Sequence, residues 1–386
     1  MVPMTNEPVI ALLCDLVAIN SVNPTLVPGA PGEGDVARSI ADTMRRAGLD
    51  VELQEAASGR PNVIGVLEGR GRGPALMLCG HTDTVGVVGM DKPFTPVEKD
   101  GRVYGRGAQD MKAGVAAMID AARSIAKSGG LASGRLLIAA VVDEEHSSIG
   151  ADALVTKYRA DAAVVTEPTD LSIAIGHKGF AWVEVEVLGK AAHGSRPADG
   201  EDAILRLGRV LSHLEALDRT LQSRVPHALV GVGSLHASLI SGGRELSSYP
   251  DHAALQLERR LTPTEREGDA LAEVQQILDG LALEDATFRA SARTMFSRPA
   301  YELRKDHDLP RLVGEALTKA GGTPTVVGAS FWADSAVLGH AGIPSVLFGP
   351  GGAGLHSTEE YVKVDEVITC RNALVELARA FCEGAV

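Results

Sequence analysis

The strongest constraint on the fold is the alternation of helical stretches with short apolar segments along most of the chain. Helical periodicity is found at residues 9–19, 34–47, directly after Met111, at 309–320 and from Val364. Short apolar segments, which indicate buried strands, are found at residues 75–79, 136–142, 162–165 and 344–349. Such alternation is typical of an α/β fold with a largely parallel sheet. We therefore predict one discontinuous α/β domain, made of residues 1–180 and 296–386.

Between residues 181 and 295 the pattern changes, and strands with alternating apolar residues flank two helical segments. In chain order these segments are FAWVEVEVLG, the helical residues 201–214, HALVGVGSL, HAALQLERRL, the helical EREGDALAEVQQILDGL, and ATFRASARTM. The order β-α-β-β-α-β is that of the ferredoxin-like unit. We predict that residues 181–295 form a second domain, inserted into the first.

Composition narrows the classes of function. The chain has 386 residues, of which 45% are hydrophobic, so it can bury two separate cores. Its formal net charge of −13 argues against nucleic acid as a partner, since phosphate binding needs clustered Lys and Arg. No segment reaches the roughly 18 consecutive apolar residues that span a bilayer, so we expect no membrane partner and a cytoplasmic protein. The cysteines have no C-x-x-C spacing and are expected to be reduced, buried thiols: Cys14, Cys79, Cys370 and Cys382.

Ionisable residues follow each apolar segment of the first domain. In chain order they are His81 and Asp83, then Asp143, Glu144 and Glu145, then Glu167, and finally His356. Asp110 lies in GRGAQDMKAG, where a glycine-rich loop leads into an alanine-rich helix. Ligands of open α/β sheets bind beyond the carboxyl ends of the strands. If these strands are parallel, all of these side chains converge on one edge of the sheet.

Each of these residues also has an ordinary interpretation when it is taken alone. A histidine near a strand end is more often a hydrogen-bonded or surface residue than a ligand, Asp110 is a suitable helix cap, and acids in turns are commonly solvated. Together, however, several carboxylates around one crevice are costly unless cations neutralise them. Two histidines and three carboxylates suit two divalent ions of the zinc type, which favour a bound hydroxide for hydrolysis. His81 would then be a ligand, and Asp83 would accept its other N–H and orient the ring.

A series of motifs, in order over nearly the whole chain, resembles those of the M20 metallopeptidases: GHTDTV, GRGAQDMKAG, DEEHSSIGA, TEP, AAHGSRP, RRLTP and FGPGGAGLHSTEEYV. This family includes acetylornithine deacetylase, succinyl-diaminopimelate desuccinylase, aminoacylase and glutamate carboxypeptidase. The resemblance implies a zinc-exopeptidase-like α/β catalytic domain with an inserted ferredoxin-like lid and dimerisation domain. It also implies a homodimer that forms through this lid domain.

The same resemblance implies a role for each ligand-type residue: His81 and Glu167 at one metal ion, Glu145 and His356 at the other, and Asp110 as the bridge between them. Glu144 is implied to be the general acid/base, and Asp83 to support His81. A non-proline cis peptide bond is expected after Asp110.

Four further residues are expected to contact the substrate. In the inserted domain, His193 of AAHGSRP resembles the residue that stabilises the tetrahedral oxyanion, and in dimeric members this histidine reaches the partner's active site. Arg260 of ERRLTP resembles the arginine that binds a substrate carboxylate. Ser247 of GGRELSSYPD stands where many members have a substrate-binding Asn, and Gly351 of FGPGGAG is also expected to bind substrate. Alternatively, His193 is an ordinary loop residue and Arg260 pairs with an acid.

These residues favour a hydrolase with two divalent metal ions, for which Zn²⁺ is the first choice and Co²⁺ or Mn²⁺ are alternatives. Its substrate would be an N-acyl amino acid or short peptide with a free carboxylate, and deacylation like that of acetylornithine deacetylase is favoured. The alternatives are a dipeptidase or carboxypeptidase of the same family, a one-metal hydrolase, and a catalytically silent binding protein. A silent member is expected to lack a ligand or the general base, and this chain retains all of them.

Overall fold

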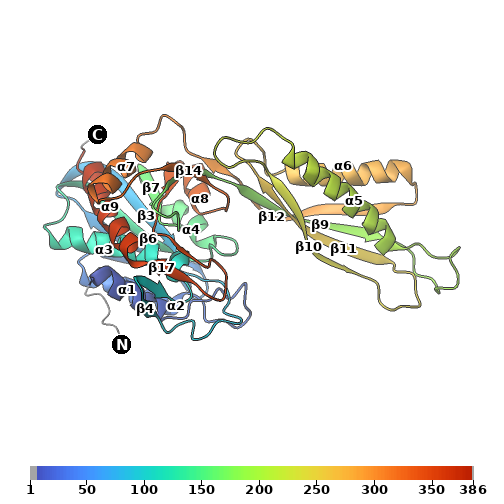
Figure 1. Cartoon of the computed structure of the whole chain (residues 1–386), viewed down its shortest axis with the longest axis horizontal. Helices are drawn as coiled ribbons and strands as arrows, with labels where there is room; N and C mark the ends of the chain where they lie inside the picture. Colours follow the sequence, from blue (N-terminus) through green and yellow to red (C-terminus); the bar gives the residue numbers. More distant parts are fainter. Residues whose placement is uncertain (1–6, 385–386) are drawn as a thin grey trace. The chain divides into compact units, whose positions relative to one another are not determined.

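The computed structural model describes residues 7–384, which form two compact units (Figure 1). The first unit contains the described residues up to Ile175, the segment Leu303–Val327 and the described residues from Ala333 onward. The second unit contains Gly176–Glu302 and Gly328–Trp332. The short segment Gly328–Trp332 returns the chain to the second unit, which the sequence pattern did not indicate. The catalytic and dimerisation roles of the two domains stay predictions.

Within residues 7–384, a nine-stranded mixed sheet, built mostly from residues of the first unit, forms the centre of that unit and confirms the α/β class. Its strands lie in the order β1-β2-β6-β3-β7-β15-β8-β13, with β14 beside β8. Their bounds are β1 (Asp50–Ala57), β2 (Arg60–Glu68), β3 (Gly71–His81), β6 (Ser133–Val141), β7 (Ala162–Val165), β8 (Ile173–His177), β13 (Tyr301–Glu302), β14 (Val326–Ala329) and β15 (Ser345–Leu347).

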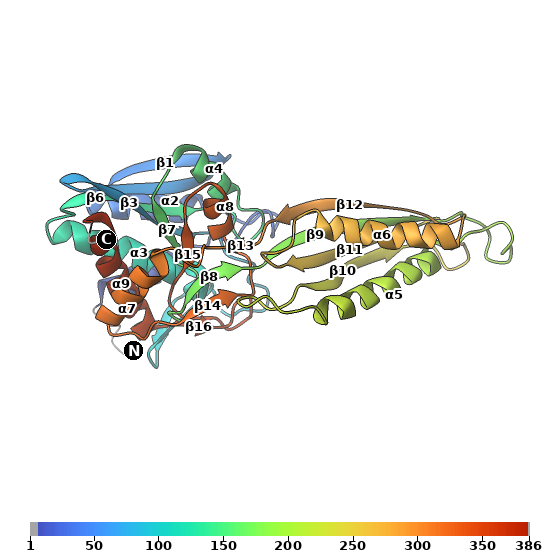
Figure 2. The same ribbon diagram turned by 90° about the horizontal axis from the view of Figure 1, so that it is seen from above.

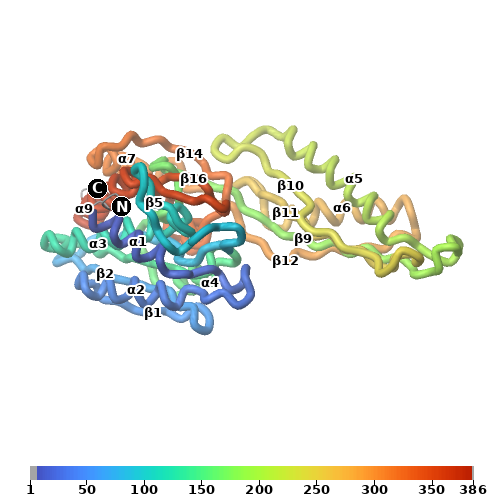
Figure 3. The backbone as a smooth tube through the Cα atoms, turned by 60° about the horizontal axis from the view of Figure 1, so that its bottom comes forward, coloured from blue at the N-terminus to red at the C-terminus, as the bar shows by residue number. Residues whose placement is uncertain are grey.

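The parallel part of this sheet is its centre, where β6, β3, β7 and β15 run in the same direction. By contrast, β1 and β2 are antiparallel to each other, and β2 is antiparallel to β6. Two residues connect β1 to β2, and such a short connection joins only antiparallel strands. The prediction of a largely parallel sheet is therefore wrong for this edge, where helix α2 (Gly34–Arg46) packs on the hairpin (Figure 3).

Helices cover both faces of the sheet. The connections β3–α3–β6 and β6–α4–β7 run in opposite directions along the sheet, so right-handed crossovers place α3 and α4 on opposite faces. Helix α9 contacts α3 and β3, whereas α8 contacts α4, β7 and β15 (Figure 1). Besides α2, the helices of the first unit are α1 (Pro8–Val17), α3 (Ala113–Lys127), α4 (Ile149–Lys157), α7 (Leu309–Lys319), α8 (Ser335–His340) and α9 (Val364–Cys382).

A small antiparallel sheet in the first unit brings two distant loops together. Its strands, in the order β16-β17-β5-β4, are β16 (Gly352–Ala353), β17 (Tyr361–Lys363), β5 (Arg102–Tyr104) and β4 (Val97–Lys99). Val103 of β5 pairs with Val362 of β17, and both side chains are buried. The turn after β5, which leads to Asp110, therefore lies beside the loop before β17, which contains His356.

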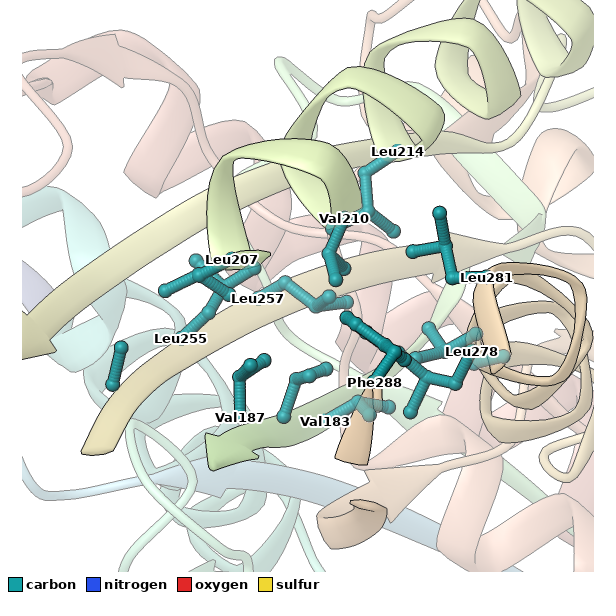
Figure 4. Packing of buried hydrophobic residues seen from close by; sticks show 14 of the residues in the cluster. Val183, Val187, Leu207, Val210, Leu214, Leu255, Leu257, Leu278, Leu281 and Phe288 are labelled. Atoms are coloured by element: carbon teal, nitrogen blue, oxygen red, sulfur yellow. The ribbon is translucent and has the colours of Figure 1, made fainter. Parts of the chain in front are cut away.

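The second unit combines an antiparallel sheet with helices α5 and α6 (Figure 2). In chain order its elements are β9 (Gly179–Leu188), α5 (Ala203–Gln222), β10 (Ser234–Gly242), β11 (His252–Leu261), α6 (Asp269–Glu284) and β12 (Arg289–Arg298). The strands lie in the order β10-β11-β9-β12. Alternate residues of β9 and β11, such as Val183 and Leu257, pack against Val210 of α5, Leu278 of α6 and Phe288 (Figure 4).

The predicted strand at residues 227–235 is wrong. The backbones of His227 and Gly231 donate to each other's carbonyls at 2.9 Å, which closes a tight loop with Gly231 at φ +71°. The strand β10 begins only at Ser234. Apolar residues at alternate positions therefore mark a partly buried loop here, because Val230 is buried within it.

The state of the cysteines and the character of the helices bear on two expectations drawn from the composition. The four cysteines all lie in the described part of the chain, and each is free and buried. Between residues 7 and 384, no helix combines the length and the apolar character that crossing a membrane requires.

Candidate metal centre

The carboxyl ends of the central parallel strands bring the predicted ligands to one edge of the sheet. His81 is the last residue of β3, Glu144 and Glu145 follow β6, and Glu167 follows β7. Asp110 lies in the short turn η1 (Ala108–Lys112), directly before α3. His356 lies in the loop between β16 and β17, at φ +58°. The peptide bond between Asp110 and Met111 is cis, as the sequence resemblance implied.

Asp110 lies between the two histidines and presents one carboxylate oxygen to each. Its Oδ1 is 3.1 Å from Nε2 of His81, and its Oδ2 is 3.4 Å from Nε2 of His356. His356 Nε2 is also 3.0 Å from Oε2 of Glu145. A carboxylate that faces two histidines in this way is suited to bridge two metal ions.

Two further glutamates face His81 from β6 and β7. Its Nε2 is 3.9 Å from Oε2 of Glu144 and 4.0 Å from Oε1 of Glu167. Among residues 7–384, ligand-type atoms within 4.8 Å of one another form two groups: His81, Glu144 and Glu167, and His81, Asp110 and Glu145. Glu144 therefore lies as close to Nε2 of His81 as the predicted ligand Glu167 does.

Two buried carboxylate oxygens of this cluster lack a hydrogen-bond donor within the described part of the chain. Among the residues that the structure describes, none donates a hydrogen bond to Oε1 of Glu145 or Oε1 of Glu167, and both atoms are buried. Leaving a charged oxygen buried without a partner costs several kcal/mol in general. Divalent cations would supply the missing interactions, so the donor set fits a metal site.

In the protein without metal, burial favours the protonated form of the three glutamates. Burial, with the charge of Glu167 added, raises the pKa of Glu144 well above 4.5, and burial with the charge of Asp110 raises that of Glu145 to about 7. Burial likewise raises the pKa of Glu167. Hydrogen bonds that His356 donates to Asp110 and Glu145 raise its pKa to about 10. A cluster that attracts protons so strongly is suited to bind cations.

The imidazole of His81 is held in the tautomer that a metal ligand needs. Burial opposes protonation of the ring, but the hydrogen bond to Asp110, together with the carboxylates of Asp83, Glu167 and Glu144, raises the pKa of His81. Nδ1 of His81 donates to the backbone carbonyl of Asp83 at 3.0 Å, whereas the Asp83 carboxylate is 3.6 Å away. The backbone carbonyl of Asp83 therefore holds Nδ1 and leaves Nε2 for a metal, and support of the ring by the Asp83 carboxylate stays a prediction.

The carboxylate of Asp83 orders the segment that contains the two glutamates. It accepts hydrogen bonds from the backbone N–H groups of Glu144 (3.1 Å) and Glu145 (3.2 Å). Asn23 donates to Oδ2 of Asp83 at 2.8 Å and to Oδ1 of Asp143 at 3.0 Å, so one side-chain amide bridges both acids. Sequence reasoning missed Asn23, although SVNP places it in a loop rich in turn residues.

A further acid next to the cluster was also missed. Asp334, at the N-terminus of α8, is buried, and its negative charge contributes to the raised pKa values of Glu144 and Glu167.

Close packing around the site explains Gly114 of the DMKAG motif: a Cβ there would lie 2.0 Å from the carbonyl oxygen of Thr166, next to Glu167.

Three of the predicted substrate-contacting residues lie in the second unit. His193 is exposed, and its Nδ1 is 2.8 Å from Oγ of Ser195. The carbonyl of Ser247 accepts from Gly194 at 2.7 Å, so Ser247 supports the turn that contains His193. Arg260 donates from Nε to Oε1 of Glu258 at 2.6 Å, which is the structural pairing given above as its alternative.

The fourth, Gly351, lies in the first unit before β16. Its N–H donates to Oε2 of Glu366 at 2.7 Å, and a Cβ would lie 1.9 Å from Oδ1 of Asp170. Close approach to Asp170 is therefore enough to explain the glycine, and a contact with substrate stays a prediction.

Comparison with known proteins identifies relatives along most of the chain. The model of peptidase family M20/M25/M40 matches residues 77–380. Acetylornithine deacetylase of Myxococcus xanthus is 31% identical over 360 residues, which cover 88% of this chain and 90% of that protein. Acetylornithine deacetylase of Photorhabdus laumondii is 29% identical, and the match covers 97% of both chains.

Solved structures share the fold. A tripeptidase from Staphylococcus aureus superposes with a TM-score of 0.82 at 21% identity, covering 98% of this chain and 99% of its own. A Bacillus subtilis protein described as a dinuclear metal binding peptidase of the M20 family has a TM-score of 0.74 at 16% identity, covering 97% and 98%. With the family model matching most of its length, the chain belongs to peptidase family M20/M25/M40 and is a metal-dependent hydrolase of amide or peptide bonds.

Proposed function

We propose that the cluster binds two divalent metal ions and that Zn²⁺ is the physiological metal. The proposed ligands are His81 and Glu167 for one ion and Glu145 and His356 for the other, with Asp110 as the bridge. The observation that carries this proposal is the position of Asp110, whose two carboxylate oxygens each face a different histidine. Imidazole and carboxylate ligands suit Zn²⁺, and Co²⁺ and Mn²⁺ accept the same types.

Glu144 is proposed to be the general acid/base of amide hydrolysis. Two bound divalent ions would lower the pKa of a water molecule and polarise the amide carbonyl. Glu144 takes the proton of the attacking water and delivers it to the leaving nitrogen. The hydrogen bond from its backbone N–H to Asp83 fixes the start of its side chain. In the protein without metal, burial and the charge of Glu167 raise the pKa of Glu144, so its surroundings accommodate a protonated carboxyl.

The proposed substrate is an N-acyl amino acid with a free carboxylate, and deacylation is favoured. Its support is the similarity of the whole chain to acetylornithine deacetylases of two bacteria. Arg260 is the proposed partner of the substrate carboxylate, for which it would exchange its present contact with Glu258. His193 is the proposed donor to the oxyanion, and Ser247 and Gly351 are proposed to line the substrate site.

A substrate panel tests this proposal. The zinc-loaded protein is assayed on compounds in which the acyl group and the amino-acid side chain vary separately, together with dipeptides and longer peptides. We expect the highest kcat/KM for an N-acetyl amino acid. Preference for dipeptides or for peptides with a C-terminal residue to remove would support the dipeptidase or carboxypeptidase alternative. No hydrolysis of any compound by metal-loaded protein would identify a silent binding protein.

We further propose a homodimer that forms through the edge strand β10. This strand is the last of its sheet within the described chain, and it exposes Leu239 and Ile240 at 65% and 61% of their surface. Leu205 of the neighbouring α5 is 73% exposed. An unpaired edge with apolar side chains is suited to pair with the same edge of a second copy around a two-fold axis.

A further inference from the structure

Glu360 is a buried carboxylate that the proposed chemistry does not use. It lies four residues after His356 and directly before β17, and only 1% of its surface is exposed. Its two oxygens accept four hydrogen bonds, which is the full capacity of a carboxylate. All four come from the segment that leads to Asp110.

These hydrogen bonds are divided evenly between the two oxygens. Oε2 accepts from Nη1 of Arg106 at 2.6 Å and from the N–H of Gly107 at 3.0 Å. Oε1 accepts from the N–H of Gln109 at 2.8 Å and from the N–H of Asp110 itself at 3.0 Å. The backbone of the bridging residue is therefore hydrogen-bonded directly to a side chain of the loop that contains His356.

Arg106 makes a second connection between the same two segments. Its side chain is buried, and its Nη2 donates to the carbonyl of Ser357 at 2.8 Å, next to His356. The side chain of His356 is 56% exposed, so packing does little to fix it. Its position depends on the backbone of its loop, which Ser357 closes with hydrogen bonds to Gly354.

We propose that Glu360 and Arg106 are positioning residues that fix Asp110 and His356 relative to each other. They thereby determine the affinity of the metal ion that Glu145 and His356 are proposed to hold, which we take to be the weaker of the two. The proposal rests on the ligand roles assigned above to these two residues. Neither side chain contacts the metals. Their effect is to hold one ligand from each segment at the spacing that a bridged pair of ions needs, and outer residues of this kind typically change metal affinity about 10- to 100-fold.

Two substitutions separate the contributions of the pair. Glu360→Gln keeps the size of the side chain but turns an NH₂ group toward one of the two donor pairs, so it disturbs the segment that contains Asp110. Arg106→Lys keeps a positive charge beside Glu360, but a single ammonium cannot reproduce the planar fork that also reaches Ser357. The matched control is Glu359→Gln, because Glu359 is the neighbouring residue and is exposed.

The measurement is binding of Co²⁺ and Zn²⁺ to chelator-stripped full-length protein without substrate. Competition with a chromophoric chelator gives the two dissociation constants, and the visible spectrum of Co²⁺ reports the ligand geometry. We expect Glu360→Gln to raise the dissociation constant of the weaker ion about 10- to 100-fold and to alter the Co²⁺ spectrum. Arg106→Lys should weaken only that ion, and Glu359→Gln should bind both ions like the unsubstituted protein.

The outcomes separate this inference from the proposed function. If Glu360→Gln lowers the thermal stability of the metal-free protein but leaves both dissociation constants unchanged, Glu360 is merely structural and the inference is wrong, although the two-metal site stands. If Glu360→Gln does not fold, unchanged binding by Arg106→Lys overturns the inference in the same way. If the unsubstituted protein binds no metal, the proposed function fails and the inference fails with it.

Discussion

Removal of metal should make the stability of this protein fall as the pH rises from about 5 to 7. Burial raises the pKa values of Glu144 and Glu167 well above 4.5, and that of Glu145 to about 7. Between pH 4.5 and about 7, these glutamates therefore bind more protons in the folded state than in the unfolded state. The free energy of unfolding then decreases with pH over that window.

The other groups of the cluster do not reverse this direction. The raised pKa values of His81 and His356 give stability that is fully present below pH 6.5 and is lost as the pH rises toward their folded values. The pKa of Asp110 is lowered because the hydrogen bonds that it accepts from His356 and His81, together with the charges of both rings, outweigh its burial. Its contribution is lost only below pH 3.8, so it stays constant between pH 5 and 7.

The pKa of Glu145 gives the expected size of this change in unfolding free energy. A change in pKa from 4.5 to about 7 corresponds to about 3 kcal/mol of unfolding free energy, lost between those two pH values. Glu145→Gln cannot ionise and does not lose this stability. The stability of the variant relative to the unsubstituted protein, both without metal, should therefore rise by about 3 kcal/mol on going from pH 4.5 to 7.

Urea unfolding checks this expectation when both proteins are measured with a chelator at several pH values between 4.5 and 7. The difference between their unfolding free energies is used, because the titration of distant groups is the same in both proteins and cancels. Saturating Zn²⁺ should abolish the fall for the unsubstituted protein, since the ions keep the carboxylates ionised. A difference that stays flat between pH 4.5 and 7 would refute the electrostatic description of the site.

Three further predictions concern catalysis. Glu144→Gln should retain both metal ions and lose about 10²- to 10⁴-fold in kcat, which single-turnover assays and metal analysis measure together; loss of a metal ion would make Glu144 a ligand instead. Arg260→Lys should raise KM for substrates with a free carboxylate far more than for their amides, and equal losses on both would leave only its pairing with Glu258. If His193 of the partner subunit completes each active site, mixing inactive His193→Ala and Glu144→Gln proteins under subunit exchange should restore activity, whereas a mixture that stays inactive contradicts the shared site.

The convergence of ligands could be predicted from sequence because it depends on local signals. Each apolar segment ends at an ionisable residue, and parallel strands must place such ends on the same edge of a sheet. His81 ends β3, and Glu145 and Glu167 follow β6 and β7 in this way. The edge hairpin β1–β2 and the start of β10 could not be predicted in this way. Both depend on the conformation of a short loop, which the apolar pattern does not indicate.

Residues that support the ligands were harder to find because their environment is set by distant parts of the chain. Glu359 and Glu360 are adjacent acids with no local feature to distinguish them, yet one is exposed and the other is buried against Arg106. The carboxylate of Asp83 likewise acts on backbone N–H groups about 60 residues away, and the pattern around it indicated only a contact with His81.

The most direct test of the two-metal hydrolase is reconstitution of activity. Chelator-stripped protein is titrated with Zn²⁺ while bound metal and hydrolysis of the best N-acyl amino acid are measured in the same samples. We expect no hydrolysis without metal, and activity that rises with added Zn²⁺ and levels off at two bound ions per chain. Hydrolysis that persists without metal, or saturation at a single ion with Asp110→Ala binding that ion unchanged, would contradict the account.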